Sequence, residues 1–258
     1  DGCLEKGLDL TRGGAHYNST GVQLMGFANV VDSLYSVKKA VFEDKLFTMA
    51  DLASWLSQDW QDAEDKRAYF LNRVPKYGND NDDVDALGVR VMDHYCDVLS
   101  GYRNFRGGFF WPGVFSVGFH ITMGAFTGAT PDGRFAGDVL GNGITPTTGN
   151  AVSGPTAIMN SVVKLPVTRA TNGVNLNMRF QGKKIRTEHL AALIQTYFRN
   201  GGTQVQFNMV DSEVLRDAQQ HPEKHRDLFV RVSGYSAEFV GLSEIAQDEI
   251  ISRTEFEI

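Results

Sequence analysis

A single glycine at the end of an apolar segment most strongly constrains how this chain can fold. The β-forming residues of 228–232 lead almost directly to Gly234, and a helical pattern begins at Ser243. Glycine readily adopts positive φ angles that other residues avoid. Taken alone, the pattern predicts a turn between a strand and a helix.

The residues around Gly234 extend this pattern into a longer signature. They are Arg231-Val-Ser-Gly-Tyr-Ser-Ala237, Phe239-Val240, Gln247-Asp248, Ile250-Ile251 and Arg253-Thr254. This segment resembles the C-terminal signature of the glycyl radical enzymes. The resemblance implies that Gly234 stores a radical once a hydrogen atom leaves its Cα, and that burial protects it from oxygen, which would cut the backbone there. Without a Cβ, the radical carbon can flatten and share its spin with the flanking amides.

The resemblance extends from Gly7 to Thr254 through several separate motifs. Among them are residues 6–11, Pro75–Asp80, Pro131–Arg134 and 153–157. Enzymes of this family are much longer than 258 residues. The resemblance therefore implies an α/β fold: the C-terminal part of a ten-stranded α/β barrel in residues 1–186, followed by the glycyl radical domain in residues 187–258.

Composition excludes several other classes of protein. Apolar residues make up 42% of the chain and charged residues 22%, which is typical of globular domains. A net charge of −6 argues against nucleic-acid binding. The chain has no apolar run of membrane-spanning length and no signal-peptide pattern at its first residues. We therefore expect a cytoplasmic protein that binds neither nucleic acid nor membrane.

The two cysteines do not form a metal or disulfide pattern. Cys3 and Cys96 lack zinc or iron–sulfur spacing, so we predict no metal site, and Cys96 lies in a predicted helix as a small apolar residue. Gly2-Cys3-Leu4-Glu5 resembles the family's Gly-Cys-x-Glu loop, whose cysteine becomes a thiyl radical. However, residues 6–18 resemble a segment that lies well downstream of that loop. We expect the thiyl cysteine to lie outside this chain.

An acidic cluster precedes one of the predicted helices. Asp80, Asp82, Asp83 and Asp85 are favoured in a first helical turn by the helix dipole. A calcium loop would need ligands at alternate positions and a closing glutamate, and the sequence has neither. The cluster therefore favours a structural role.

Periodicity predicts most of the other elements. Helices are expected over 27–41, from Thr48 with Asp51 in a capping box, after the acidic cluster, over 187–199 and 211–220, and from Ser243. Strands are expected over 203–210 and 228–232, and their strand–helix–strand spacing predicts parallel pairing.

An apolar alternation in residues 110–120 predicts a further strand. It places Phe115 and Val117 on one face and Ser116 and His120 on the other. The resemblance implies that Phe115 and Val117 form part of the substrate wall of the barrel; ordinary core packing is the alternative. Since an apolar wall leaves a buried hydroxyl unpaired, at a cost of about 1–3 kcal/mol, it favours a substrate with an aromatic or hydrocarbon-like portion.

The resemblance also implies a mechanism and partners. A radical S-adenosylmethionine activating enzyme removes hydrogen from Gly234, the glycyl radical generates a cysteine thiyl, and the thiyl attacks a small-molecule substrate without a bound cofactor. We expect a lyase close to the glycerol or diol dehydratases and arylacetate decarboxylases, homodimeric at full length. The alternatives are a spare-part or split subunit, a pyruvate formate-lyase-type formate acetyltransferase, and an inactive α/β binding domain.

Overall fold

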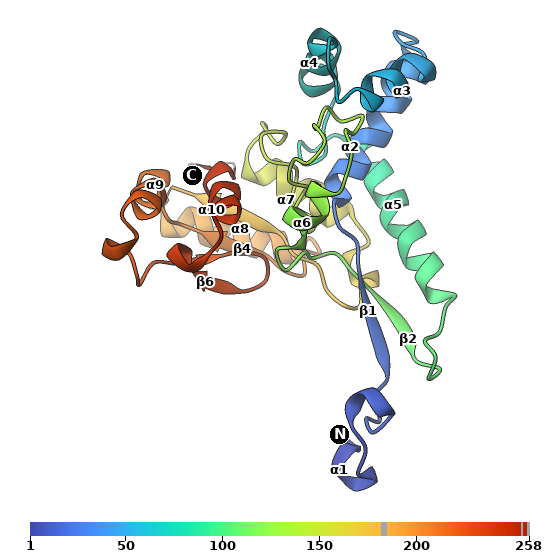
Figure 1. Ribbon diagram of the computed structural model, residues 1–258, viewed down its shortest axis with the longest axis vertical. Helices are drawn as coiled ribbons and strands as arrows, with labels where there is room; N and C mark the ends of the chain where they lie inside the picture. Colours follow the sequence, from blue (N-terminus) through green and yellow to red (C-terminus); the bar gives the residue numbers. More distant parts are fainter. Residues whose placement is uncertain (182–184, 254, 257–258) are drawn as a thin grey trace.

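The structure is a computed structural model that describes residues 1–181, 185–253 and 255–256 of the chain. It is elongated, with α1 at one end, α3 and α4 at the other, and α9, α10 and β6 projecting to one side (Figure 1). Thr254, the last residue of the signature, lies outside the described residues. No helix in the described part of the chain has both the length and the apolarity that crossing a membrane requires.

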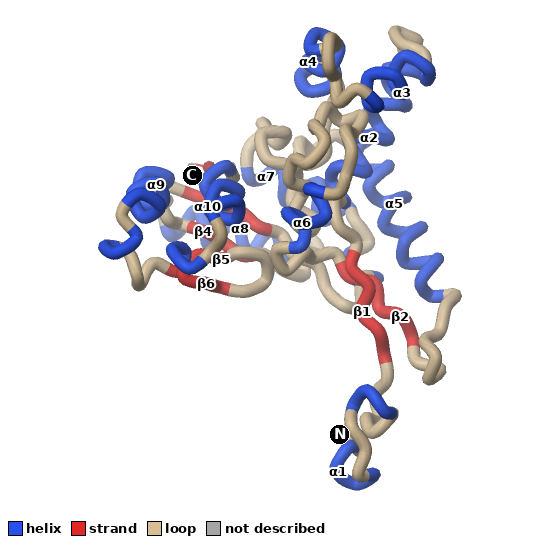
Figure 2. The backbone as a smooth tube through the Cα atoms, in the orientation of Figure 1, coloured by secondary structure: helices blue, strands red, loops and turns tan. Residues whose placement is uncertain are grey.

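Helices supply most of the regular structure, and the strands are short (Figure 2). The helices are α1 (Cys3–Lys6), α2 (Phe27–Val37), α3 (Met49–Ser57), α4 (Glu64–Asn72), α5 (Asp82–Ser100), α6 (Phe119–Ala125), α7 (Pro155–Lys164), α8 (Thr187–Arg199), α9 (Ser212–Gln220) and α10 (Glu244–Ser252). The strands are β1 (Ser19–Gln23), β2 (Phe109–Gly113), β3 (Asn177–Phe180), β4 (Gln206–Asn208), β5 (Phe229–Arg231), β6 (Ser236–Glu238) and β7 (Glu255–Phe256).

Parallel pairing connects strands that are far apart in the sequence. β1 pairs with β2, and β3 lies between β4 and β7, all in parallel. Just after β2, the Val114 amide donates to Gly173 O at 2.9 Å and Val114 O accepts from the Asn175 amide at 3.0 Å. These two bonds continue the parallel pairing beyond the end of β2, with residues 173–175, which precede β3. Residues 114–118 therefore lie close to that segment.

The apolar residues form two cores. The larger one is made by α2, α5, α7 and the loops around them. A smaller one, containing Leu215, Val230, Val232, Phe239 and Ile250, belongs to the C-terminal elements. The predicted domain boundary between residues 186 and 187 stays a prediction, and β3 pairs across it with β4 and β7.

The helix predictions agree well with the structure. Thr48 and Asp51 form both bonds of the predicted capping box, and α8 has the predicted bounds. The helix after the acidic cluster is α5, capped by the Asn81 side chain, which accepts from the Val84 amide at 3.2 Å. Cys96 lies buried in α5, and burial raises the pKa of its thiol.

The strand predictions were partly wrong. The strand expected over 110–120 ends at Gly113, because Val117 and Gly118 have φ angles of 49° and 90°, and His120 already lies in α6. The strand expected over 203–210 is limited to β4. The predicted parallel pairing of 203–210 with 228–232 is also wrong, since β5 pairs antiparallel with β6.

Candidate functional site

Gly234 lies in the tight turn that joins β5 to β6. The Val232 amide donates to Tyr235 O at 2.9 Å, and Gly234 has a φ of 85° at the third position of the turn. A Cβ added to Gly234 would lie 3.6 Å from Asn175 Nδ2, an ordinary van der Waals separation. The backbone conformation, rather than lack of space, therefore favours glycine here.

Ser233, the neighbour of Gly234, anchors the turn to the rest of the molecule. Its hydroxyl donates to Asn142 Oδ1 at 2.8 Å and lies 2.9 Å from the Ser116 hydroxyl. The Asn142 amide group also donates to Val232 O at 3.3 Å. Because Ser116, Asn142 and Ser233 are all buried, these bonds hold the turn against the segment that follows β2.

Two amide side chains of β4 hold β5 and the turn from the other side. Gln206 Oε1 accepts from the Gly234 amide at 3.2 Å and from the Arg231 guanidinium at 3.1 Å. Asn208 bonds to both backbone groups of Arg231, at 2.7 Å each. The Asn208 side chain thus makes the hydrogen bonds to β5 that the backbone of β4 would make if the two strands were paired.

The end of α10 supplies a buried charged group to the same turn. The Arg253 guanidinium donates to Arg231 O at 2.9 Å and to Val232 O at 2.7 Å, and it is paired with the Glu249 carboxylate at 2.8 Å. Burial alone would raise the pKa of Glu249, but Arg253 and His120 outweigh it and lower that pKa to about 2. Glu249 Oε1 lies 3.5 Å from Nε2 of the fully buried His120.

A cavity of about 230 Å³ is lined in part by the paired Glu249 and Arg253. Its walls include Asn142, Asn177, Arg179, Glu249 and Arg253. The guanidinium groups that line it are engaged with protein oxygens. The cavity is therefore contiguous with the polar network that holds the Gly234 turn.

The expectation that Gly234 is buried was wrong for this chain. Ser233 and Val232 are buried, but Gly234 and Tyr235 are exposed. The physical reason is that the residues that hold the turn, among them Ser116, Asn142 and Gln206, leave its outer side uncovered. Nothing among the described residues covers its outer side.

The two predicted substrate-wall residues lie next to this turn. Phe115 is half-buried, Val117 is 47% exposed, and Ser116 between them bonds to Ser233. The structure therefore brings the two predicted parts of the site together, although residues 115–117 are not a strand. Val117 is β-branched and has a φ of 49°, a strained conformation that costs about 1–3 kcal/mol and is found most often at functional sites.

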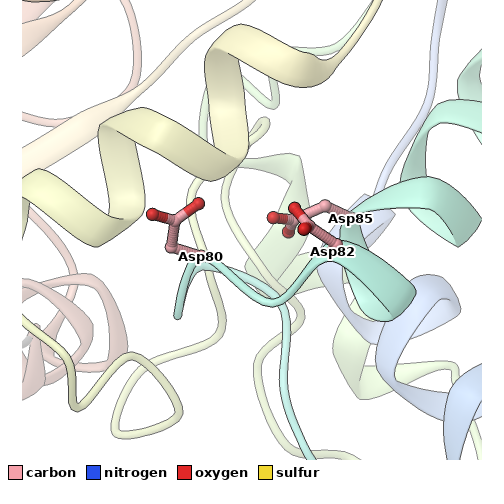
Figure 3. A group of neighbouring side chains, drawn as sticks. All are labelled: Asp80, Asp82 and Asp85. Carbon is pink, nitrogen blue, oxygen red and sulfur yellow. The ribbon is translucent and has the colours of Figure 1, made fainter.

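Cys3 and the acidic cluster lie elsewhere. Cys3 is in α1, at the far end of the molecule from β6 (Figure 1), consistent with the expectation that it is not the thiyl cysteine. The carboxylates of Asp80, Asp82 and Asp85 converge beside α7 (Figure 3). Lys164 Nζ donates to all three at 2.7, 2.7 and 2.8 Å, so an ammonium group already occupies the centre of this cluster.

Sequence reasoning missed most of the polar residues that hold the turn. These are Ser116, His120, Asn142, Gln206, Asn208 and Glu249. One signal was available: in 203–210, the amide residues Gln206 and Asn208 alternate with apolar ones, and the buried face of β4 is the amide face. The remaining residues come from separate segments, and only the tertiary structure brings them together.

Comparison with known proteins gives a consistent result along the chain. Residues 1–124 match the pyruvate formate lyase-like family, and residues 140–240 match the glycine radical family. A probable dehydratase of Escherichia coli, YbiW, is 41% identical over 99% of this chain and 33% of its own length. Trans-4-hydroxy-L-proline dehydratase of Clostridioides difficile is 38% identical over the same shares. Other relatives are named as decarboxylases and sulfite-lyases.

Solved structures agree with the sequence matches. The B12-independent glycerol dehydratase of Clostridium butyricum superposes with a TM-score of 0.95 at 43% identity, over 100% of this chain and 33% of that one. The chain thus spans about a third of the length of the relatives that it matches, and its fold is that of the corresponding third. The chain belongs to the glycyl radical enzyme family and corresponds to the C-terminal portion of its members.

Proposed function

We propose that this chain is the radical-storing portion of a glycyl radical lyase and that Gly234 carries the radical. The observation that carries the proposal is the geometry of the turn: Gly234 has positive φ, bonds through its amide to Gln206, and lies beside residues 115–117. A radical at Cα is favoured where the residue has no side chain. The backbone on both sides of that residue must also be held in place. The network around Ser233 and Arg253 supplies that support.

The radical is made and used in steps that involve other groups. A radical S-adenosylmethionine activating enzyme takes one hydrogen atom from the Gly234 Cα, forming 5′-deoxyadenosine and leaving the spin on the backbone. The glycyl radical then takes a hydrogen atom from a cysteine thiol that lies outside this chain, and the resulting thiyl radical takes one from the substrate. The reaction class is radical lyase chemistry such as dehydration, decarboxylation or C–C or C–N cleavage, with no bound cofactor.

Because Gly234 is exposed among the described residues, the site needs a further segment to cover it. We infer that a further polypeptide segment, in the same longer chain or in a separate subunit, covers Gly234, Phe115 and Val117 and brings the thiyl cysteine. The apolar Phe115 and Val117 then form part of the substrate wall and favour a substrate with an aromatic or hydrocarbon-like portion. The complete enzyme is a homodimer with residues 1–186 in the barrel and residues 187–258 in the radical domain.

Electron paramagnetic resonance tests the role of Gly234. After anaerobic activation, the spectrum should show two lines, because the radical carbon keeps one hydrogen, and deuterated glycine should collapse them. Gly234→Ala should show no such signal, while losing only about 1 kcal/mol of stability from the positive φ. Gly137→Ala, which also replaces a glycine with positive φ and open surroundings, should keep the signal. A glycyl signal that persists in Gly234→Ala would refute the proposal.

A second candidate function, a spare-part or split subunit, is favoured by the exposed outer side of Gly234. Mixing the chain with a full-length relative whose own radical glycine has been replaced by alanine tests it. Restored activity supports docking in trans. If the mixture is inactive although the chain itself still forms the glycyl radical, the result supports the view that the chain is a portion of one longer enzyme.

A further inference from the structure

A buried glutamine side chain bonds to the backbone of Gly234 itself. Gln206 lies in β4 and is 5% exposed, and its Oε1 accepts a hydrogen bond from the Gly234 amide at 3.2 Å. By contrast, Asn208 and Asn142 bond to neighbouring residues of the hairpin. Gln206 is therefore placed to act on a peptide group that would share the spin of a Gly234 radical.

The orientation of the Gln206 amide group follows from what surrounds it. The Gly234 N–H and the Arg231 guanidinium, which lies 3.1 Å from Gln206 Oε1, can only donate, so the oxygen must face them. On the other side, Gln206 Nε2 donates to Asn177 Oδ1. Turning this buried amide group would leave donors without acceptors, which is unfavourable. The side chain is therefore fixed relative to the turn.

A radical at the Cα of Gly234 would draw on both neighbouring peptide groups. The amide nitrogen supplies electron density to the half-filled orbital, and the carbonyl group on the other side withdraws it. A hydrogen bond from the N–H to an acceptor leaves more electron density on the nitrogen, and such polarisation is strong in a buried site. The bond to Gln206 therefore increases the contribution of the nitrogen to the stability of the radical.

The same bond defines the plane into which the radical must relax. Gly234 has a φ of 85°, so its carbonyl group lies out of the plane of the peptide group that joins it to Ser233. Full sharing of the spin requires the two peptide planes to align, because only parallel p orbitals overlap. Gln206 holds the amide side through the N–H, and Asn142 holds the Ser233 side chain. The rotation therefore takes place on the carbonyl side, toward the exposed Tyr235.

We propose that Gln206 is a positioning residue for the Gly234 radical: its oxygen holds the plane of the Gly234 amide and increases the spin density on the amide nitrogen. The inference deepens the proposed function and rests on it, because it concerns the radical that Gly234 stores. This role differs from that of Asn208, which holds the hairpin through Arg231. The strength of the acceptor at position 206 sets how the spin is distributed, and not only how firmly the turn is held.

Electron–nuclear double resonance on the 258-residue chain, labelled with nitrogen-15 glycine and activated anaerobically, measures this distribution. The coupling to the Gly234 nitrogen should be smaller in Gln206→Met, which has only a weak acceptor, and larger in Gln206→Glu, whose carboxylate accepts more strongly. Gln204→Met is the matched control, because Gln204 Oε1 accepts from the Leu176 amide at 2.8 Å, and it should leave the coupling unchanged. A purely structural role would not order the three acceptors in this way.

Amide hydrogen exchange tests the bond itself in the chain before activation. Protection of the Gly234 amide should fall about fivefold in Gln206→Met, the factor for one hydrogen bond of ordinary strength, and should stay unchanged in Gln204→Met. Unchanged protection in Gln206→Met would overturn the inference, because the Gly234 amide would then not depend on Gln206. No radical is needed for this measurement.

The outcomes separate this inference from the proposed function. A glycyl signal in Gln206→Met with the nitrogen coupling of the unmodified chain would overturn the inference and leave the role of Gly234 intact. Absence of the signal from the unmodified chain would refute both. If Gln206→Met does not fold or forms no radical, Gln206→Glu decides, since a coupling no larger than in the unmodified chain would contradict the ordering of acceptors.

Discussion

Gly234 and Val117 both have positive φ angles, but for different physical reasons. For glycine at 85° the conformation has no steric cost, whereas for a β-branched residue at 49° it is strained. The strained valine contacts solvent in this chain and lies next to the segment that holds the turn. A strained residue at the surface is consistent with a role in a binding site, and we propose that Val117 forms part of the substrate wall.

Val117→Asn tests the strain at Val117. Asparagine tolerates positive φ, so the free energy of unfolding should rise by about 1 kcal/mol in chemical denaturation. Val152→Asn provides the control, because Val152 is more exposed and has no positive φ. If both variants change stability equally, Val117 is not strained. If Val117 lines the substrate cavity, the completed enzyme should lose activity in Val117→Asn despite its greater stability.

At the scale of elements, the β5–β6 hairpin is held by side chains from β4 and α10 more than by strand pairing. Asn208 satisfies both backbone groups of Arg231, and Arg253 bonds to the carbonyl groups of Arg231 and Val232. The predicted parallel pairing of 203–210 with 228–232 was wrong because the Asn208 side chain, rather than the backbone of β4, bonds to the backbone of β5. A hairpin held in this way can separate from the parallel sheet without disrupting it.

Asn208→Ala should therefore weaken the hairpin selectively. Loss of two partly buried hydrogen bonds should lower stability by about 2 kcal/mol and reduce the exchange protection of the Arg231 amide, with little change in β3. Asn72→Ala, in an exposed position of α4 where the side chain bonds to Ala68 O within the same helix, should change stability by less than about 0.5 kcal/mol. Equal loss of protection in β3 and β5 would mean that the hairpin does not move separately.

At the scale of the whole molecule, one ion cluster, of which only Asp85 is buried, joins helices that are distant in the sequence. Lys164 at the end of α7 bonds to Asp80, Asp82 and Asp85 at the start of α5, and Asp85 is almost fully buried. The acidic residues also suit the first turn of α5 through the helix dipole. Lys164 thereby joins the end of α7 to the start of α5, two helices of the larger core.

Lys164→Met should leave the buried Asp85 carboxylate without its cation and lower stability by about 3 kcal/mol. Calcium should restore part of this loss in the variant, because three carboxylates then surround a vacant centre, and it should leave the unmodified chain unchanged. Lys66→Met, which removes a surface pair with Asp65, should have almost no effect in thermal denaturation. Calcium stabilisation of the unmodified chain would contradict the structural role of Lys164.

The sequence by itself determined the family, the α/β class and several of the helices, and it pointed to Gly234, because each rests on local periodicity, capping or a continuous motif. Only the tertiary structure decided which residues hold the turn, since Ser116, Asn142, Asn208 and Arg253 lie far apart in the chain and meet only through folding. It also decided that Gly234 is exposed on its outer side and that residues 115–120 leave the extended conformation. Those features depend on long-range contacts, which no local pattern of residues encodes.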